Sequence, residues 1–180
     1  MTSDADPFEA FVRSHQDMVY GVAVRLLGNP AEAEDVAQTV FLKAFQRFDE
    51  LGASPSAAAW LRTVTKNACL NHLSRYRARW RFFSELESGE PTDQSFADTI
   101  ASSSSPVLDF ERDDQREHIE QALRALPDHQ RVPLVLFHLE GTSYQDIAAL
   151  LSVSLAKVKT DIYRGREALR RQLAHIHASR

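Results

Sequence analysis

Residues 142–173, TSYQDIAALLSVSLAKVKTDIYRGREALRRQL, determine the fold of the C-terminal part of this chain. Thr142 and Gln145 have the spacing of a capping box, which predicts that a helix begins here. Its inward face consists of Ile147, Ala148, Leu150 and Leu151. A turn follows at residues 152–154, and Ser154 is placed to cap a second helix whose buried stripe is Val158, Ile162, Gly165, Leu169 and Leu173. The pattern predicts a helix-turn-helix.

The outer face of the second helix is basic. At about 100° per residue, the side opposite the stripe carries Ala156, Thr160, Tyr163, Arg164, Glu167 and Arg171, with Lys157 and Lys159 at its flanks. Such a helix fits the major groove of DNA, where its first turns approach base edges and other cations meet phosphates. We expect base contacts from Thr160, Tyr163 and Arg164, and phosphate contacts from Lys157, Lys159, Arg166 and Arg171. A charged face alone fits a solvated helical hairpin, but the turn and the cap favour DNA.

The charge distribution supports two basic surfaces joined by an acidic connector. The net charge of −4 is an average, because residues 51–84 contain no Asp or Glu. Residues 85–114 hold nine acidic side chains and a single arginine, together with Gly89, Pro91 and a serine run. This composition buries too little apolar surface to offset its ordering entropy. We therefore expect an acidic flexible linker at residues 85–112, between domains at residues 1–84 and 113–180.

The N-terminal segment has the start signals of helices. Asp6, Pro7 and Glu9 form one N-terminal signature, and Asn29, Pro30 and Glu32 form another. The second signature leads into an apolar stripe of Ala33, Val36, Ala37, Val40, Phe41, Ala44, Phe45 and Phe48. Pro55 is expected to open a third helix, which continues or bends into a basic helix that ends near Phe83. Since no strand-like alternation is present, the chain is predicted to be all-α, with two small helical domains.

Several functional classes are disfavoured by the sequence. A single cysteine, Cys69, excludes an internal disulfide framework and cannot build a thiolate metal site by itself. No apolar run is long enough to span a bilayer, and the N-terminus lacks a secretion signal, so we expect a cytoplasmic protein without membrane insertion. The chain has no phosphate-loop motif, nucleophile elbow or metal-ligand spacing. We therefore expect no enzyme activity, no cofactor and no metal.

Three segments, in order, resemble sigma factors of the extracytoplasmic-function (ECF) type. AEAEDVAQTVFLKAFQRF, residues 31–48, resembles their polymerase-binding helix. AAAWLRTVTKNACLNHLSRYRAR, residues 57–79, resembles their promoter-melting helices, and residues 122–173 resemble their fourth-region domain. The resemblance implies an alternative sigma factor with a region 2-like and a region 4-like domain. Its implied partners are core RNA polymerase, promoter DNA and an anti-sigma factor.

The resemblance also implies roles for individual residues. Polymerase contacts fall on side chains that lie off the packing stripe of the helix from Pro30: Glu34, Asp35, Gln38, Thr39, Leu42 and Gln46. The acids there also favour the positive end of the helix, by about 0.3–1 kcal/mol each, and both roles can coexist. A flipped base of the minus-ten element would enter a pocket formed by residues 49–56 and Asn67. Strand phosphates would meet Arg62, Lys66, Asn71, Arg75 and Arg77. For Trp60, core packing is favoured over base contact.

Some positions depart from the family pattern and leave the promoter sequence open. Ala57 replaces an aromatic residue, Phe137 replaces an arginine that touches the minus-thirty-five element, and Pro133 is atypical. Asp161 replaces a basic residue and would repel phosphate unless it faces a cytosine amine or a neighbouring cation. Two alternatives to a sigma factor stay open at this point. One is a free-standing helix-turn-helix regulator, and the other is a sequestering module whose basic faces bind protein.

Overall fold

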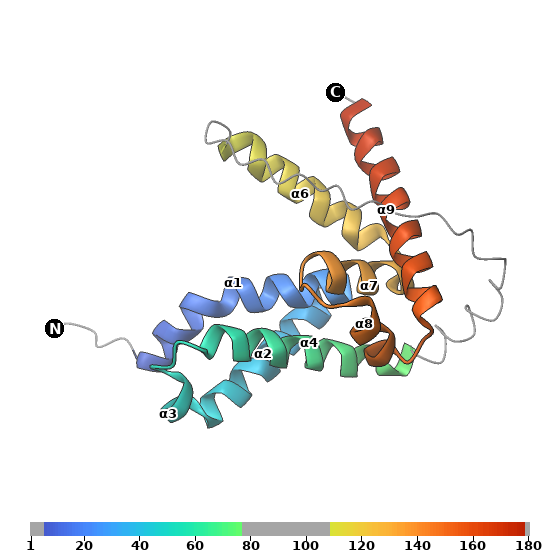
Figure 1. The fold of residues 1–180 in the computed structure, drawn as a ribbon. Coiled ribbons are helices and arrows are strands. Elements are labelled where there is room, and N and C mark those ends of the chain that lie inside the picture. The colour runs from blue at the N-terminus through green and yellow to red at the C-terminus, as the bar shows by residue number, and fades with distance from the viewer. Residues whose placement is uncertain (1–5, 77–108, 179–180) are drawn as a thin grey trace. The chain divides into compact units, whose positions relative to one another are not determined.

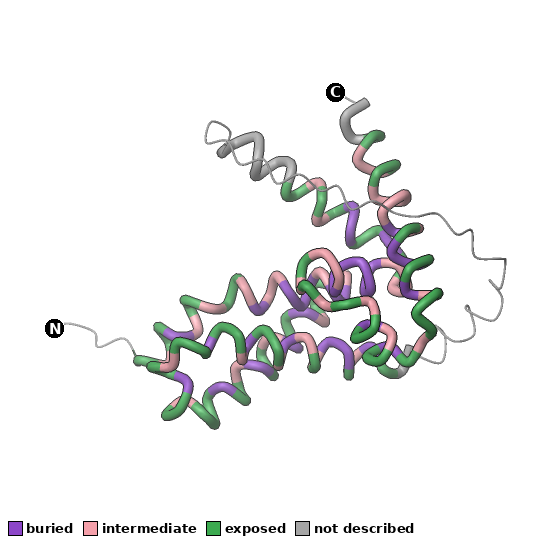
Figure 2. Tube along the Cα trace, viewed as in Figure 1, coloured by how far each residue is buried: buried purple, intermediate pink, exposed green. Residues whose placement is uncertain are grey.

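The structure, a computed structural model, describes residues 6–76 and 109–178. The chain divides into two compact units, and the described residues of each unit are helical throughout their regular structure, as the sequence predicts (Figure 1). Buried and exposed positions alternate along the described helices, as expected for amphipathic helices that cover a core (Figure 2). Most of the predicted linker, residues 85–108, lies outside the described residues.

The N-terminal unit is built on three long helices that pack against one another in pairs. These are α1 (Pro7–Leu27), α2 (Pro30–Gln46) and α4 (Ala57–His72). Both predicted start signals are confirmed, because the Asp6 carboxylate accepts from the Phe8 N–H and the Asn29 side chain accepts from the Ala31 N–H. The core includes Val19, Leu26, Val40, Leu61 and Cys69, all with exposed fractions of 0%.

The connection between α2 and α4 differs from the prediction. A short helix, α3 (Phe48–Leu51), intervenes, and α4 begins at Ala57 rather than at Pro55. Pro55 lies in a turn that the Ala57 N–H closes on the Ser54 carbonyl, at 3.1 Å. At its other end, α4 passes into a 3-10 turn, η1 (Leu73–Tyr76), and the predicted continuation to Phe83 lies outside the described residues.

The apolar stripe of α2 is only partly buried. Ala33, Val36, Val40 and Ala44 are buried as predicted. Phe45, however, is 60% exposed, so its assignment to the packing stripe was wrong. The stripe extends into the last turn of α2, where the Phe45 ring packs edge-on against the Phe8 ring, with ring centroids 4.9 Å apart. An exposed phenylalanine next to an exposed leucine, Leu42 at 66%, marks a surface of interest.

The described residues of the C-terminal unit form four helices, and α9 contacts the other three. They are α6 (Asp109–Ala125), α7 (Asp128–His138), α8 (Tyr144–Leu151) and α9 (Leu155–Ala178). The first helix begins before the predicted start at residue 113, so residues 109–112 of the predicted linker are helical. Pro133 is buried inside α7, which continues through it.

The helix-turn-helix forms as predicted, with one shift in its cap. The N-cap of α8 is Ser143, whose hydroxyl accepts from the Asp146 N–H at 3.1 Å and donates to the Asp146 carboxylate at 2.8 Å. Thr142 was therefore the wrong cap, because its own N–H closes the end of α7 on the Leu136 carbonyl, at 2.9 Å. Ile147 and Leu151 are buried, whereas Leu150 is 38% exposed and does not belong to the inward face.

The turn and the second helix follow the prediction closely. Ser152 adopts a left-handed conformation with a φ of 56° and ends α8. The Ser154 hydroxyl accepts from the Lys157 N–H at 3.2 Å, as expected for the cap of α9. Val158, Ile162 and Gly165 are buried, whereas Leu169 and Leu173 of the predicted stripe are only half-buried. A Cβ at Gly165 would lie 3.2 Å from the Gln130 carbonyl oxygen. A glycine at this position therefore lets α9 approach the backbone of α7.

Candidate functional site

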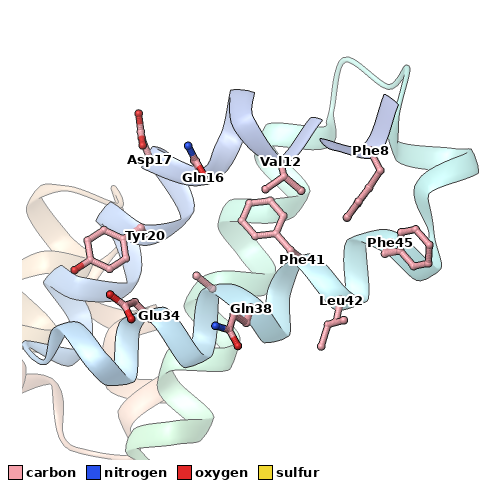
Figure 3. A pocket seen from close by; sticks show the side chains of 11 residues that line it. Phe8, Val12, Gln16, Asp17, Tyr20, Glu34, Gln38, Phe41, Leu42 and Phe45 are labelled. Carbon is pink, nitrogen blue, oxygen red and sulfur yellow. The ribbon is translucent and has the colours of Figure 1, made fainter. Parts of the chain in front are cut away.

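The N-terminal unit carries an open groove of about 820 Å³ between α1 and α2. Its walls are mostly apolar, and its polar side chains are two acids and two glutamines next to one tyrosine. The lining residues are Phe8, Val12, Gln16, Asp17 and Tyr20 from α1 and Glu34, Ala37, Gln38, Phe41, Leu42 and Phe45 from α2. In Figure 3, Phe41 extends from α2 toward Val12 on α1, whereas Leu42 points away from α1.

The polymerase-contacting residues predicted on α2 divide into two sets. Glu34, Gln38 and Leu42 line the groove. Asp35, Thr39 and Gln46 are exposed on α2 without lining it, and the Thr39 hydroxyl donates to the Asp35 carbonyl at 3.0 Å. All of them lie on the outer side of the helix, as the predicted packing stripe required. Their contact with polymerase stays a prediction.

The wall of the groove on α1 was missed by sequence reasoning. Phe8, Val12, Gln16 and Tyr20 follow one another at steps of four, so they share one face of α1. Phe8 also packs edge-on against Phe48, with ring centroids 5.2 Å apart. The spacing was visible in the sequence. The groove itself could not be predicted, because the sequence does not tell which face of α1 lies beside α2.

Glu32 is held inside the N-terminal unit. Its carboxylate lies 3.3 Å from the Nε2 atom of His72, which joins the first turn of α2 to the last turn of α4. The side chains of both residues are less than a third exposed. Glu32 therefore serves the packing of the two helices as well as the positive end of α2.

The predicted minus-ten residues of α4 lie on two different flanks of the helix. Arg62 and Lys66 are about 40° apart, and so are Asn67 and Asn71. The two pairs are separated by about 100–180° around the helix axis, so α4 does not bring all four to one surface. Arg62, Asn67 and Asn71 are exposed, and Lys66 is half-buried. The side chain of Arg75, in η1, and all of Arg77 lie outside the described part.

Trp60 lies on the same flank of α4 as Asn67 and has a specific neighbour. The guanidinium carbon of Arg47 is 5.8 Å from the centre of the half-buried Trp60 ring, a cation–π arrangement. The Nε and Nη2 atoms of Arg47 donate to the Oε2 atom of Glu50, at 3.2 and 2.7 Å. Arg47 thus connects the start of α3 to Trp60 of α4, and residues 49–51 of this segment belong to the loop predicted to line the base pocket.

The predicted DNA-contacting residues of α9 differ in how they are exposed. Lys159, Thr160, Tyr163 and Arg171 are exposed, whereas Arg164 is half-buried. The Thr160 hydroxyl donates to the Ala156 carbonyl at 3.0 Å. Arg166 is also half-buried, and its Nε atom donates to the Nε2 atom of His138 on α7 at 2.9 Å. Their contacts with DNA stay predictions, and Arg166 already has a structural role.

Asp161 is buried and faces a cation. It is 4% exposed, and its two carboxylate oxygens lie 3.2 and 3.0 Å from the Nζ atom of Lys157. The Lys157 side chain is itself only 10% exposed. Of the two orientations considered for Asp161, the structure adopts the one toward a neighbouring cation. Lys157 is therefore less accessible to a phosphate than Lys159 is.

Phe137, another departure from the family pattern, packs within the C-terminal unit. Its ring stacks on Tyr144, with centroids 4.4 Å apart and an angle of 5° between the planes. This contact joins the end of α7 to the start of α8. The position therefore stiffens the frame of the helix-turn-helix.

Neither a metal-binding cluster nor a membrane-spanning helix is found among the described residues. No cluster of three or more His, Cys, Asp or Glu in residues 6–76 and 109–178 is arranged to hold a metal ion. None of the described helices has both the length and the apolar character that a bilayer span requires.

Comparison with known proteins identifies the family. A model of sigma-70 region 2 matches residues 11–80, and a model of sigma-70 region 4 matches residues 116–169. The ECF RNA polymerase sigma factor SigW of Bacillus subtilis is 29% identical over 96% of this chain and 92% of its own length. The RNA polymerase sigma factor CarQ of Myxococcus xanthus is 30% identical over 95% of this chain and 91% of its own length.

A third relative is similar over most of this chain and of its own length, whereas a solved structure has a lower sequence identity. The RNA polymerase sigma-E factor of Streptomyces coelicolor is 31% identical over 92% of this chain and 85% of its own length. The sigma factor RpoE, solved in complex with the anti-sigma factor NepR from Bartonella quintana, matches with a TM-score of 0.48 and 24% identity, over 94% of this chain and 98% of that one. With both sigma-70 regions matched in order and near full-length relatives of this kind, the chain belongs to the ECF sigma factors.

Proposed function

We propose that this ECF sigma factor binds core RNA polymerase through the groove between α1 and α2, and anchors on promoter DNA through α9. One observation carries the proposal: the two units present outward surfaces of opposite chemistry. The groove is apolar with the acids Asp17 and Glu34 at its rim, whereas α9 exposes Lys159 and Arg171. An apolar, acidic groove fits protein, and a basic capped helix fits the DNA major groove.

The partner of the groove is a helical element with an apolar stripe and basic flanks. A groove between two helices accepts a third helix, whose apolar residues follow one another at steps of three and four. Leu42 and Phe45, 66% and 60% exposed, supply apolar surface that such a helix would cover. The acids on the rim would orient it by charge complementarity and accelerate the encounter more than they raise the affinity.

Promoter recognition is divided between the two units. The N-terminal unit opens the duplex and holds the minus-ten strand, with Asn67 at a base pocket and with Arg62, Lys66, Asn71, Arg75 and Arg77 on phosphates. The C-terminal unit binds the minus-thirty-five duplex, with Thr160, Tyr163 and Arg164 toward bases and Lys159, Arg166 and Arg171 toward phosphates. Because the cations of α4 lie on a different flank from its asparagines, we place the strand around α4 rather than along one face.

The catalytic step belongs to core polymerase in this scheme, and the sigma factor has no enzyme activity of its own. Because a sigma factor acts together with core polymerase on chromosomal promoters, we propose that the protein is cytoplasmic. An anti-sigma factor is a further proposed partner, which would cover both units until a signal releases them. The acidic segment that precedes α6, residues 85–108 of the predicted linker, is proposed as a connector that can follow a basic channel of polymerase.

Two other functions are less well supported. A free-standing helix-turn-helix regulator would use the C-terminal unit alone, and it leaves the region 2 match over residues 11–80 without a role. A sequestering module would require both basic faces to bind protein. The cap, the turn and the exposed polar side chains of α9 fit a duplex better.

In vitro transcription with purified core polymerase tests the proposal. Core polymerase plus the full chain should give promoter-dependent RNA from a pool of genomic templates, whereas the chain alone should bind duplex promoter weakly. The absence of promoter-dependent RNA from any template would overturn the sigma function. Operator binding by the chain alone, as a symmetric dimer, would instead support the free-standing regulator.

A further inference from the structure

The ion pair between Lys157 and Asp161 lies where a DNA-reading helix would normally keep its cations available. Lys157 is in the first turn of α9, and its N–H is capped by Ser154 at 3.2 Å. The Nζ atom lies within 3.2 Å of both carboxylate oxygens of Asp161. The Lys157 side chain is 10% exposed and that of Asp161 is 6% exposed. The ammonium group is thus enclosed with its counter-charge.

Helix stability alone explains this pair poorly. A lysine in the first turn is opposed by the positive end of the helix dipole. The order Lys157 before Asp161, four residues apart, is also the less favourable orientation for such a pair on a helix surface. Buried ion pairs often contribute no more than well-packed apolar residues of similar volume. Stability alone is therefore a poor reason for this arrangement.

We propose that Asp161 is a positioning residue that withholds Lys157 from the DNA phosphates. This inference rests on the proposed function and deepens it, because it names which cations of α9 contact the duplex. The first turns of α9 then contact DNA through Lys159, Thr160 and Tyr163, which are exposed. One phosphate contact fewer lowers the affinity for every sequence equally, so binding depends more on the bases that are read.

The salt dependence of promoter binding separates Lys157 from Lys159. Each phosphate contact contributes about −0.9 to the slope of log K against log salt concentration. Holoenzyme made with Lys159→Gln should therefore have a slope shallower by about 0.9, whereas holoenzyme made with Lys157→Gln should keep the slope of the original protein. Asp161→Asn should release Lys157 and make the slope steeper by about 0.9, on promoter and unrelated DNA alike. An equal loss of slope in Lys157→Gln and Lys159→Gln overturns the inference.

Chemical labelling tests the enclosed ammonium group without DNA. When the folded full chain is treated with an acetylating reagent, Lys159 should react at least about tenfold faster than Lys157, since only exposed amines react readily. Asp161→Asn should remove most of this difference. Equal rates in the original protein overturn the inference, even if Asp161→Asn does not fold. Because labelling needs neither polymerase nor promoter, a failure of the sigma function appears separately, as absent transcription with Lys157 still protected.

Discussion

Helices α2 and α9 share one architecture and differ in what they present outward. Each has a capped start, a buried stripe and an outer face, but α2 exposes Leu42 and Phe45 whereas α9 exposes Lys159 and Arg171. The two helices also differ in the environment of an aspartate, since Asp35 of α2 is exposed whereas Asp161 of α9 is buried against Lys157. The stripe therefore specifies the fold of each unit, and the chemistry of the outer face specifies the class of partner.

The largest effect is expected from Leu42→Glu, which places a charge in the apolar part of the groove. Binding of core polymerase should weaken by about 2–3 kcal/mol, a factor of roughly 30–150 in Kd, because an exposed leucine that becomes buried contributes this much. Fluorescence titration of labelled protein with core polymerase measures it.

Leu139→Glu is the matched control, because Leu139 is also exposed, at 46%, but lies at the end of α7. The Kd of Leu139→Glu for polymerase should stay within about twofold of that of the original protein. The free energy of unfolding of both variants should differ from that of the original protein by no more than about 0.5 kcal/mol. Equal losses in the two variants would contradict the groove as the polymerase site.

The comparison also shows which features the sequence could predict. The starts of α1, α2 and α9 were predicted correctly because a cap depends on residues two or three positions apart. The burial of Phe45 and Leu150 was predicted wrongly, since burial depends on whether another helix covers that turn. Within the site, the outward residues of α2 followed from periodicity. The cation beside Asp161 was one of two expected partners, but the α1 wall and the burial of the Lys157–Asp161 pair did not follow from periodicity, because both depend on which elements cover those faces.

Arg164→Ala tests whether α9 reads bases. If the guanidinium bonds to a guanine edge, discrimination between the promoter and one substituted at that base should fall by about 1–3 kcal/mol. Holoenzyme binding to a series of promoters, each with one minus-thirty-five base changed, measures this difference.

Lys159→Ala is the comparison for Arg164→Ala, because an exposed lysine on phosphate should weaken binding to every member of the promoter series equally. A uniform loss from Arg164→Ala as well would move Arg164 to the phosphate contacts. The helix would then read the duplex through Thr160 and Tyr163.

Gly165→Val should destabilise the C-terminal unit and leave the N-terminal unit unchanged. The new Cβ would lie 3.2 Å from the Gln130 carbonyl oxygen, so α9 must move away from α7. Overpacking destabilises by about 1–3 kcal/mol, and replacing a glycine inside a helix offsets part of this penalty through the higher helix propensity of the new residue. We therefore expect a net loss of about 1–2 kcal/mol in the free energy of unfolding. Hydrogen exchange followed by mass spectrometry resolves the two units. Ala174→Val, at an exposed position of α9, should show little change, and equal destabilisation by both variants would contradict close packing at Gly165.

The smallest effect distinguishes the two possible caps of α8. Ser143→Ala removes the hydroxyl that bonds both the Asp146 N–H and the Asp146 carboxylate, and it should lower the free energy of unfolding of the C-terminal unit by about 1 kcal/mol. Thr142→Ala should cost less than about 0.5 kcal/mol, because the N–H that closes α7 on Leu136 belongs to the backbone and survives the change. Denaturant unfolding of both variants measures the difference. A larger loss from Thr142→Ala would return the cap to Thr142 and shift the start of α8 by one residue, while the Ser154 cap that orients α9 would be unaffected.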